Sequence, residues 1–198
     1  MQAAIRLYRA IGYRKTTVAD IARSASMSPA NIYRFFPSRQ AVEEAVVAGL
    51  LDEVCAGAGS EARSNVSGGE RLEAAFWTIC QRHEHRLAQD GRLHELVVAA
   101  GQANWPVVLS YGDRVRGLVR SIIAAGQASG EFRAGSPTAL ARCTCEAMGA
   151  YLDPSRMSTI AGRAAFDEMM SFCCGALRSA APAQVAGHSP RYRATCRA

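Results

Sequence analysis

The feature that most constrains this chain is the spacing of its apolar residues, which follows the α-helical period along most of the sequence. Ala4, Leu7, Tyr8 and Ile11 recur at intervals of three and four residues, so residues 2–11 are expected to form an amphipathic helix that ends at Gly12. The alternation of apolar and polar residues that is typical of β-strands is nearly absent. The sequence therefore predicts an all-α protein.

Residues 17–36 contain the signals of two short helices joined by a tight turn. Thr17 and Asp20 match a capping box, which begins a first helix of about two turns. Ser28 is a suitable N-cap for the second helix, Pro29 occupies its first position, and Pro37 ends it. This is the layout of a helix-turn-helix, in which the second helix enters the major groove of DNA with its N-terminal residues nearest the bases.

The rest of the chain is typical of longer helices separated by glycine, serine and proline. A fourth helix follows Ser38 to about Cys55, and the Gly/Ser/Ala-rich stretch 57–69 is expected to be the loop between two regions. Further helices are expected over residues 70–89, 93–103, 107–127, 137–152 and 162–178. We therefore expect a three-helix helix-turn-helix domain (1–46), a C-terminal helical domain (47–180), and a disordered tail without apolar periodicity (181–198).

The positive charge of the chain is concentrated at its start. The whole sequence carries a formal charge of +6, from 23 basic and 17 acidic residues. Residues 1–39 contain seven basic side chains and one acid, Asp20, whereas the remaining 16 basic and 16 acidic residues cancel. A local excess of this kind indicates contact with nucleic acid or an anionic membrane surface, with a solvated face charged by chance as the alternative.

The outward face of the second short helix supplies groups that read DNA. Asparagine pairs bidentately with adenine and arginine with guanine, and small residues let the backbone approach the groove floor. We therefore expect base contacts from Pro29, Ala30, Asn31 and Arg34. Phosphate contacts are expected from residues at helix starts and flanks, namely Lys15, Thr17, Ser28, Tyr33 and Arg39. Alternatives remain open, because Thr17 and Ser28 would cap helices without DNA, Tyr33 could be core, and Arg34 could be an ordinary surface residue.

Two segments of this region closely resemble the DNA-binding domain of TetR-family transcriptional regulators. They are GYRKTTVADIA (12–22) and MSPANIYRFFPSR (27–39). The resemblance implies that residues 28–35 form the recognition helix and that Arg39 replaces the family's phosphate-clamping lysine, which preserves the charge but not the contact geometry. Ser26 stands where the family often has glycine in the turn, and a left-handed conformation there would cost roughly 1 kcal/mol.

Residues 70–178 are loosely similar to the effector-binding and dimerisation domain of the same family. This implies a homodimeric regulator, usually a repressor, that a small-molecule effector releases from a palindromic DNA operator. The helices near 137–152 and 162–178 carry few charges, and they would pair with those of a second copy. Dimerisation also meets a geometric need, because one recognition helix reads only a few bases whereas a twofold dimer reads a palindrome.

Large apolar side chains of this second region are candidates to line an effector cavity. They are Phe76, Trp77, Cys80, Trp105, Tyr111, Met148 and Tyr151. The alternative for each is ordinary core, because aromatic residues and methionines at helical spacing most often pack inside. His83 and His85 are two residues apart on a helix and point in different directions, so we expect no metal site there.

Seven cysteines leave open a redox trigger in place of a small molecule, although none forms a C-x-x-C pair and small core hydrophobes are the simpler interpretation. A helical enzyme is a further alternative, but the sequence offers no catalytic Ser/His/Asp layout, phosphate-binding glycine loop or metal-ligand spacing. No apolar run approaches the ~18–20 residues of a membrane span, and no secretory signal is recognisable. We expect a cytoplasmic, non-enzymatic regulator without cofactor, metal or membrane contact.

Overall fold

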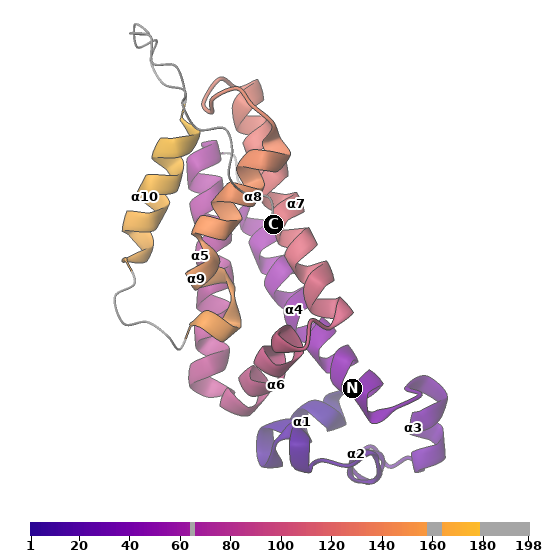
Figure 1. The fold of residues 1–198 in the computed structure, drawn as a ribbon. Helices are drawn as coiled ribbons and strands as arrows, with labels where there is room; N and C mark the ends of the chain where they lie inside the picture. The colour runs from indigo at the N-terminus through magenta and orange to yellow at the C-terminus, as the bar shows by residue number, and fades with distance from the viewer. Residues whose placement is uncertain (64–65, 158–163, 179–198) are drawn as a thin grey trace, which may run out of the picture.

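A computed structural model describes residues 1–63, 66–157 and 164–178 (Figure 1). Its first part comprises α1 (Gln2–Ile11), the short 3-10 helix η1 (Tyr13–Lys15), α2 (Val18–Ser24), α3 (Pro29–Phe35) and α4 (Arg39–Glu61). Its second part comprises α5 (Gly68–Gln89), α6 (Gly91–Gln102), α7 (Pro106–Ala128), α8 (Pro137–Ala147), α9 (Gly149–Leu152), η2 (Pro154–Arg156) and α10 (Phe166–Leu177). One isolated antiparallel bridge joins Phe132 to Arg178. The all-α prediction is confirmed.

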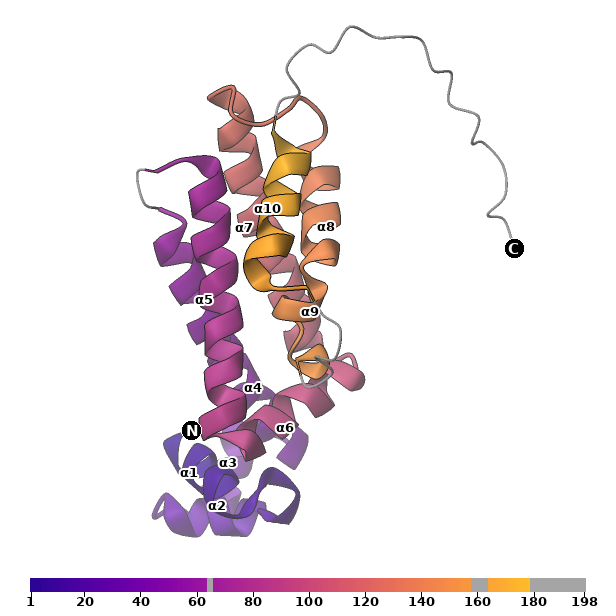
Figure 2. The same cartoon turned by 90° about the vertical axis from the view of Figure 1, so that its left-hand side faces the viewer.

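The helices form a small unit at one end of an elongated bundle. Helices α1, α2 and α3 make the small unit, and α4 leads from it into the bundle of α5 and α7–α10 (Figure 1). Helix α6 crosses the junction between the two, as both views show (Figure 2). The predicted boundary between residues 46 and 47 falls inside α4, which is continuous and belongs to both parts. A single cluster of buried apolar side chains extends from Ala3 to Leu177.

Polar contacts also join the small unit to α6. The Arg92 guanidinium, in the first turn of α6, donates hydrogen bonds to the carbonyl oxygens of Arg9 (3.0 Å) and Ala10, at the C-terminal end of α1. The Arg9 guanidinium in turn pairs with the Asp90 carboxylate at 2.8 Å. A cation at the C-terminal carbonyls of a helix is favoured by the helix dipole. The start of α6 is therefore fastened to α1.

The expected loop over residues 57–69 is largely wrong. Helix α4 continues through Gly57 and Gly59 to Glu61, and α5 already begins at Gly68. A Cβ atom on Gly57 would lie 2.6 Å from the Arg82 Nε of α5, so glycine lets this side chain cross α4 closely. The Ser67–Glu70 capping box marks the true start of α5 and is a signal that the sequence does contain.

The later helices also differ from prediction in their ends. The helix expected over 137–152 is interrupted at Met148, which separates α8 from α9. The last helix begins at Phe166, and the two residues before it, Ala164 and Ala165, are not helical. Residues 162–163, where this helix is expected to begin, lie outside the described residues. The expected tail, residues 181–198, also lies outside them. Within the described ranges, no helix combines the length and apolar character that crossing a membrane requires.

Candidate nucleic-acid interface and ligand cavity

The turn between α2 and α3 is built by hydrogen bonds that the local sequence specifies. Thr17 and Asp20 form the predicted capping box, with Asp20 N donating to Thr17 Oγ1 at 3.1 Å and Thr17 N donating to Asp20 Oδ2 at 3.0 Å. Ser26 adopts the left-handed conformation, with φ of 54°, and Met27 N then donates to Ala22 O at 2.9 Å. Ser28 Oγ accepts from Asn31 N at 3.2 Å and caps α3.

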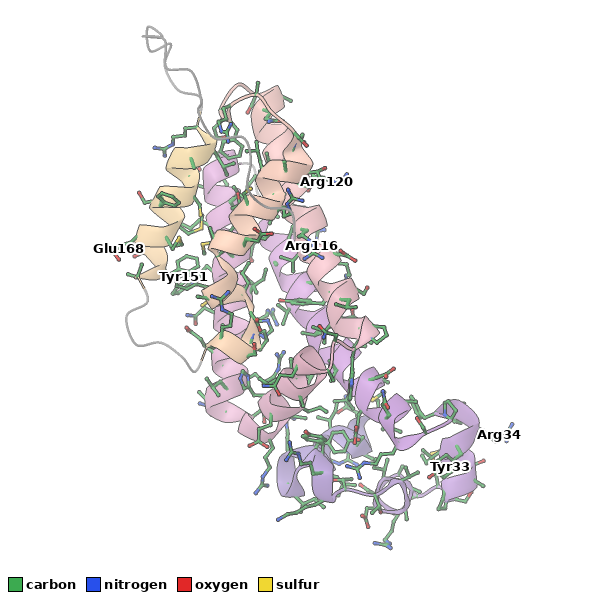
Figure 3. All side chains as sticks on the ribbon, viewed as in Figure 1. Tyr33, Arg34, Arg116, Arg120, Tyr151 and Glu168 are labelled. Carbon is green, nitrogen blue, oxygen red and sulfur yellow. The ribbon has the colours of Figure 1, made fainter. Side chains whose placement is uncertain are left out.

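Helix α3 is held by its inner face and presents the rest to solvent. Ile32 is buried against the core and Phe36 is half-buried beside it, whereas Tyr33 is 50% and Phe35 69% exposed. Tyr33 and Arg34 project outward from the end of the molecule (Figure 3). All residues predicted to contact DNA are exposed: Lys15, Thr17, Ser28, Pro29, Ala30, Asn31, Tyr33, Arg34 and Arg39.

The positive charge of this end is only partly neutralised within the protein. All seven basic side chains of residues 1–39 are exposed. Three of them form ion pairs, through Arg9 with Asp90, Arg23 with Asp20, and Arg39 with Glu43. In the part of the chain that the structure describes, Lys15 and Arg34 form none. The end of the molecule that carries α3 thus keeps uncompensated positive charge at Lys15 and Arg34, as a phosphate-binding surface requires.

Arg39 has a structural role that the sequence did not predict. Its Nη2 donates to the carbonyl oxygen of Tyr13 at 2.7 Å, and its Nε donates to Glu43 Oε1 at 2.8 Å. The bond to Tyr13 fastens the start of α4 to η1, which precedes α2, and the bond to Glu43, within α4, holds the guanidinium in place. A phosphate contact by Arg39 stays a prediction, and it would have to share or replace these partners.

A cavity of about 350 Å³ lies in the bundle, between α4, α6, α7 and the segment from α8 to η2. Most of its wall is apolar, with contributions from Leu51 of α4, Val97 of α6 and Val115 of α7. The polar groups on the wall come from Gln102, Tyr111, Arg116, Asp153 and Ser155. Cavities of this size and character are typical of small-molecule sites.

Among the seven residues predicted to line an effector cavity, only Tyr111 belongs to this wall. Phe76, Cys80, Met148 and Tyr151 are buried in the packed core, and Trp105 is half-buried at the start of α7. Trp77 is 48% exposed and its ring contacts that of Phe166. The other six lie outside the wall of this cavity, and a role for them in effector binding stays a prediction. Helical spacing identifies the buried face of a helix but not the place where packing stays incomplete.

Burial changes the acid–base behaviour of several groups in the bundle. It lowers the pKa of His83 to about 3 and raises that of Tyr111, so both are neutral near pH 7. Burial also raises the pKa of the thiols of Cys55, Cys145, Cys173 and Cys174, that of Cys145 to about 11.

No group of three or more metal-ligating side chains gathers within the described ranges.

Comparisons with known proteins cover both parts of the chain. The family described as "Bacterial regulatory proteins, tetR family" matches residues 1–46, and "Tetracyclin repressor-like, C-terminal domain" matches residues 69–171. No curated protein gives a significant sequence match.

Solved structures with the same fold include three bacterial regulators. A tetR-family regulatory protein from Rhodococcus RHA1 is 18% identical, with a TM-score of 0.58 over 91% of this chain and 95% of that one. A TetR/AcrR-family regulator from Thermobifida fusca is 23% identical, with a TM-score of 0.60 over 88% and 91%. The regulator FadR from Bacillus subtilis, in complex with stearoyl-CoA, is 14% identical, with a TM-score of 0.61 over 89% and 97%.

The two family matches agree with the geometry, in which a helix-turn-helix with an exposed second helix stands on a helical bundle with a cavity. The chain therefore belongs to the TetR family of bacterial transcriptional regulators.

Proposed function

We propose that the protein is a homodimeric repressor that binds a palindromic operator through α3 and releases it when a small molecule occupies the bundle cavity. The observation that carries the DNA-binding half is the exposed face of α3, where Asn31 and Arg34 stand beside each other with no ion pair to Arg34 among the described residues. These two side chains suit adenine and guanine edges in the major groove. Pro29 and Ala30 leave the tip of the helix narrow.

Phosphate contacts complete the proposed interface. Lys15 and Tyr33 are exposed on either side of the turn, and Thr17 and Ser28 stand at the N-terminal ends of α2 and α3. Both hydroxyls already accept a backbone hydrogen bond, and Thr17 Oγ1 also donates to Asp20 Oδ2 at 2.6 Å. A phosphate contact at Ser28 would therefore use its O–H group and the free amides beside it, whereas one at Thr17 would use the free amides or replace Asp20 as the acceptor. Such contacts set the position of α3 in the groove.

The proposed dimer interface lies on α8 and α10, which lie side by side in the bundle (Figure 2). Phe172 of α10 is 67% exposed, and Gly175 and Ala176 beside it are exposed small residues. Ala139 and Cys143 are exposed on α8. An exposed phenylalanine among small side chains is the kind of surface that a second helix pair covers closely.

The proposed trigger is a ligand, and the mechanism is a shift in population. A molecule that fits the cavity better in one arrangement of the helices favours that arrangement, in which the two copies of α3 no longer match the two half-sites. The structural neighbour from Bacillus subtilis holds stearoyl-CoA, which supports ligand binding in this architecture. Cysteine oxidation is the less favoured trigger, because the raised thiol pKa values at Cys55, Cys145, Cys173 and Cys174 disfavour the reactive thiolate.

Titration of fluorescent DNA from beside the protein's own gene tests the DNA-binding proposal. Arg34→Ala should lower the affinity roughly fivefold or more, since a bidentate arginine–guanine pair contributes about 1–3 kcal/mol. Arg120→Ala is the matched control, because Arg120 is also exposed but lies on α7 of the bundle (Figure 3). Equal affinity of wild type, Arg34→Ala and Arg120→Ala would contradict the role of α3.

A further inference from the structure

Three polar side chains form a buried chain that ends at the cavity wall. Arg86 Nη2 donates to the carbonyl oxygen of Leu50 at 3.0 Å, and Arg86 Nη1 lies 3.0 Å from His83 Nδ1. His83 Nε2 lies 3.0 Å from the Tyr111 hydroxyl oxygen. His83 is fully buried, and Arg86 and Tyr111 are nearly so. The chain links α4, α5 and α7, and Tyr111 is the only member that belongs to the cavity wall.

The direction of each hydrogen bond follows from the chemistry of arginine. A guanidinium only donates, so His83 Nδ1 must accept from Arg86 and carries no proton. The neutral imidazole then has its proton on Nε2, and this N–H donates to the Tyr111 oxygen. The low pKa of His83, about 3, agrees with a neutral ring. Tyr111 is therefore an acceptor towards His83.

The remaining consequence concerns the Tyr111 proton. The Tyr111 hydroxyl cannot donate this proton to His83 Nε2, which is itself a donor, and no other atom in the described ranges accepts a hydrogen bond from it. The acid on the cavity wall, Asp153, accepts through its Oδ1 from Ser155 N at 2.9 Å and Ser155 Oγ at 2.7 Å, and among the described residues it accepts no hydrogen bond from Tyr111. A buried donor without an acceptor is unfavourable, so this hydroxyl favours an acceptor atom brought in by a molecule in the cavity.

The other side chains of the cavity wall indicate the chemical character of the rest of that molecule. Leu51, Val97, Val108, Val115 and Leu152 supply apolar surface from four elements, which suits a hydrocarbon or aromatic body. Arg116 adds a positive charge at the wall, paired with the exposed Asp113 at 2.6 Å. The oxygen acceptor of a ketone or a carboxylate would be compatible with both Tyr111 and Arg116.

We infer that the cavity binds an apolar molecule with one terminal oxygen acceptor, a carbonyl or carboxylate, and that the Tyr111 hydroxyl donates the hydrogen bond that recognises it. This rests on the proposed ligand-binding function and adds the chemical class of the ligand. Apolar contacts give most of the affinity, whereas the Tyr111 hydrogen bond discriminates against molecules of the same shape without the oxygen.

Calorimetric titration of the full-length protein with three probes tests this class. The probes are 4-phenyl-2-butanone, 4-phenylbutyrate and butylbenzene, which share an aromatic body and differ in the oxygen group. Wild type should bind the ketone or the carboxylate at least about tenfold more tightly than butylbenzene. Tyr111→Phe, which removes only the hydroxyl, should reduce that preference about tenfold and leave butylbenzene binding unchanged. The ketone and carboxylate arms separate a neutral acceptor from an anionic one.

Gly101→Leu provides the site control. Gly101 is on the cavity wall, and a Cβ atom there would meet nothing within 4 Å. The Cβ of the leucine therefore causes no steric clash, and the rest of its side chain should fill the cavity. This variant should bind none of the probes. Probe binding unaffected by Gly101→Leu, an unchanged preference in Tyr111→Phe, or binding of no probe by folded wild type would each overturn the inference. DNA binding is measured separately, so failure with the probes alone leaves the DNA-binding proposal intact.

Discussion

Replacement of Arg92 by methionine tests the contact between the cavity helix α6 and the small unit. Methionine keeps most of the side-chain stem, which packs beside Gly12, but removes the donors to the carbonyl oxygens of Arg9 and Ala10. A hydrogen bond from a charged donor contributes about 1.5–3 kcal/mol when shielded, and solvent exposure of Arg92 reduces this to roughly 1 kcal/mol. Loss of the cation at the helix terminus adds about 0.3–1 kcal/mol. Together these terms give about 1–2 kcal/mol.

Hydrogen exchange at the end of α1 measures this energy. The Gly12 N–H donates to Tyr8 O at 3.0 Å and reports opening of the last turn of α1. In Arg92→Met its exchange should be about 5- to 30-fold faster, which corresponds to 1–2 kcal/mol. Asp90→Asn is the matched control, because it removes only the half-exposed ion pair with Arg9, a contribution of about 0–1 kcal/mol. Unchanged exchange in Arg92→Met, or equal effects of the two variants, would refute the role assigned to Arg92.

Two further pairs of variants test the interface and the packing of the bundle. Phe172→Glu on α10 should convert the dimer to a monomer, as measured by light scattering after gel filtration. Leu109→Glu changes an exposed apolar side chain on α7 and should leave the dimer intact. A Phe172→Glu variant that stays dimeric would contradict the proposed interface. Gly126→Ala places a Cβ 2.3 Å from the buried Phe132 ring and should lower the free energy of unfolding, since overpacking costs about 1–3 kcal/mol against a helix-propensity gain of about 1. Gly117→Ala on the same helix meets nothing within 4 Å and should raise that free energy by up to about 1 kcal/mol, so equal urea midpoints for the two variants would disprove the packing argument.

Local chemistry explains which parts of the fold could be predicted. The Thr17–Asp20 capping box, the Ser28 cap and Pro29 at the first position of α3 all depend on neighbours within a few residues, and the sequence predicts each of them. The family pattern, which often has glycine at the position of Ser26, indicates the left-handed conformation that Ser26 adopts. The loop predicted around Gly57 is absent because this glycine makes room for Arg82, which belongs to another helix and leaves no local signal in the sequence.

The cavity and its polar chain depend on contacts between distant parts of the sequence. Leu50, His83 and Tyr111 belong to three helices, and helical spacing alone does not indicate that they meet. The spacing of His83 and His85 predicts only that they do not share a metal, yet His83 is the centre of a buried chain. Arg86, three residues later on the same helix face, is the one local signal that could have indicated this contact.

The central claim, that the exposed face of α3 reads a DNA sequence, is tested most directly by selection from a random pool of double-stranded DNA. Wild type should enrich a palindrome whose half-sites lie about one helical turn, or a multiple of it, apart. Arg34→Ala, selected in parallel, should lose the preference at one position in each half-site and keep it elsewhere. Enrichment of no common sequence by wild type, or of the same sequence with the same preferences by Arg34→Ala, would contradict the account.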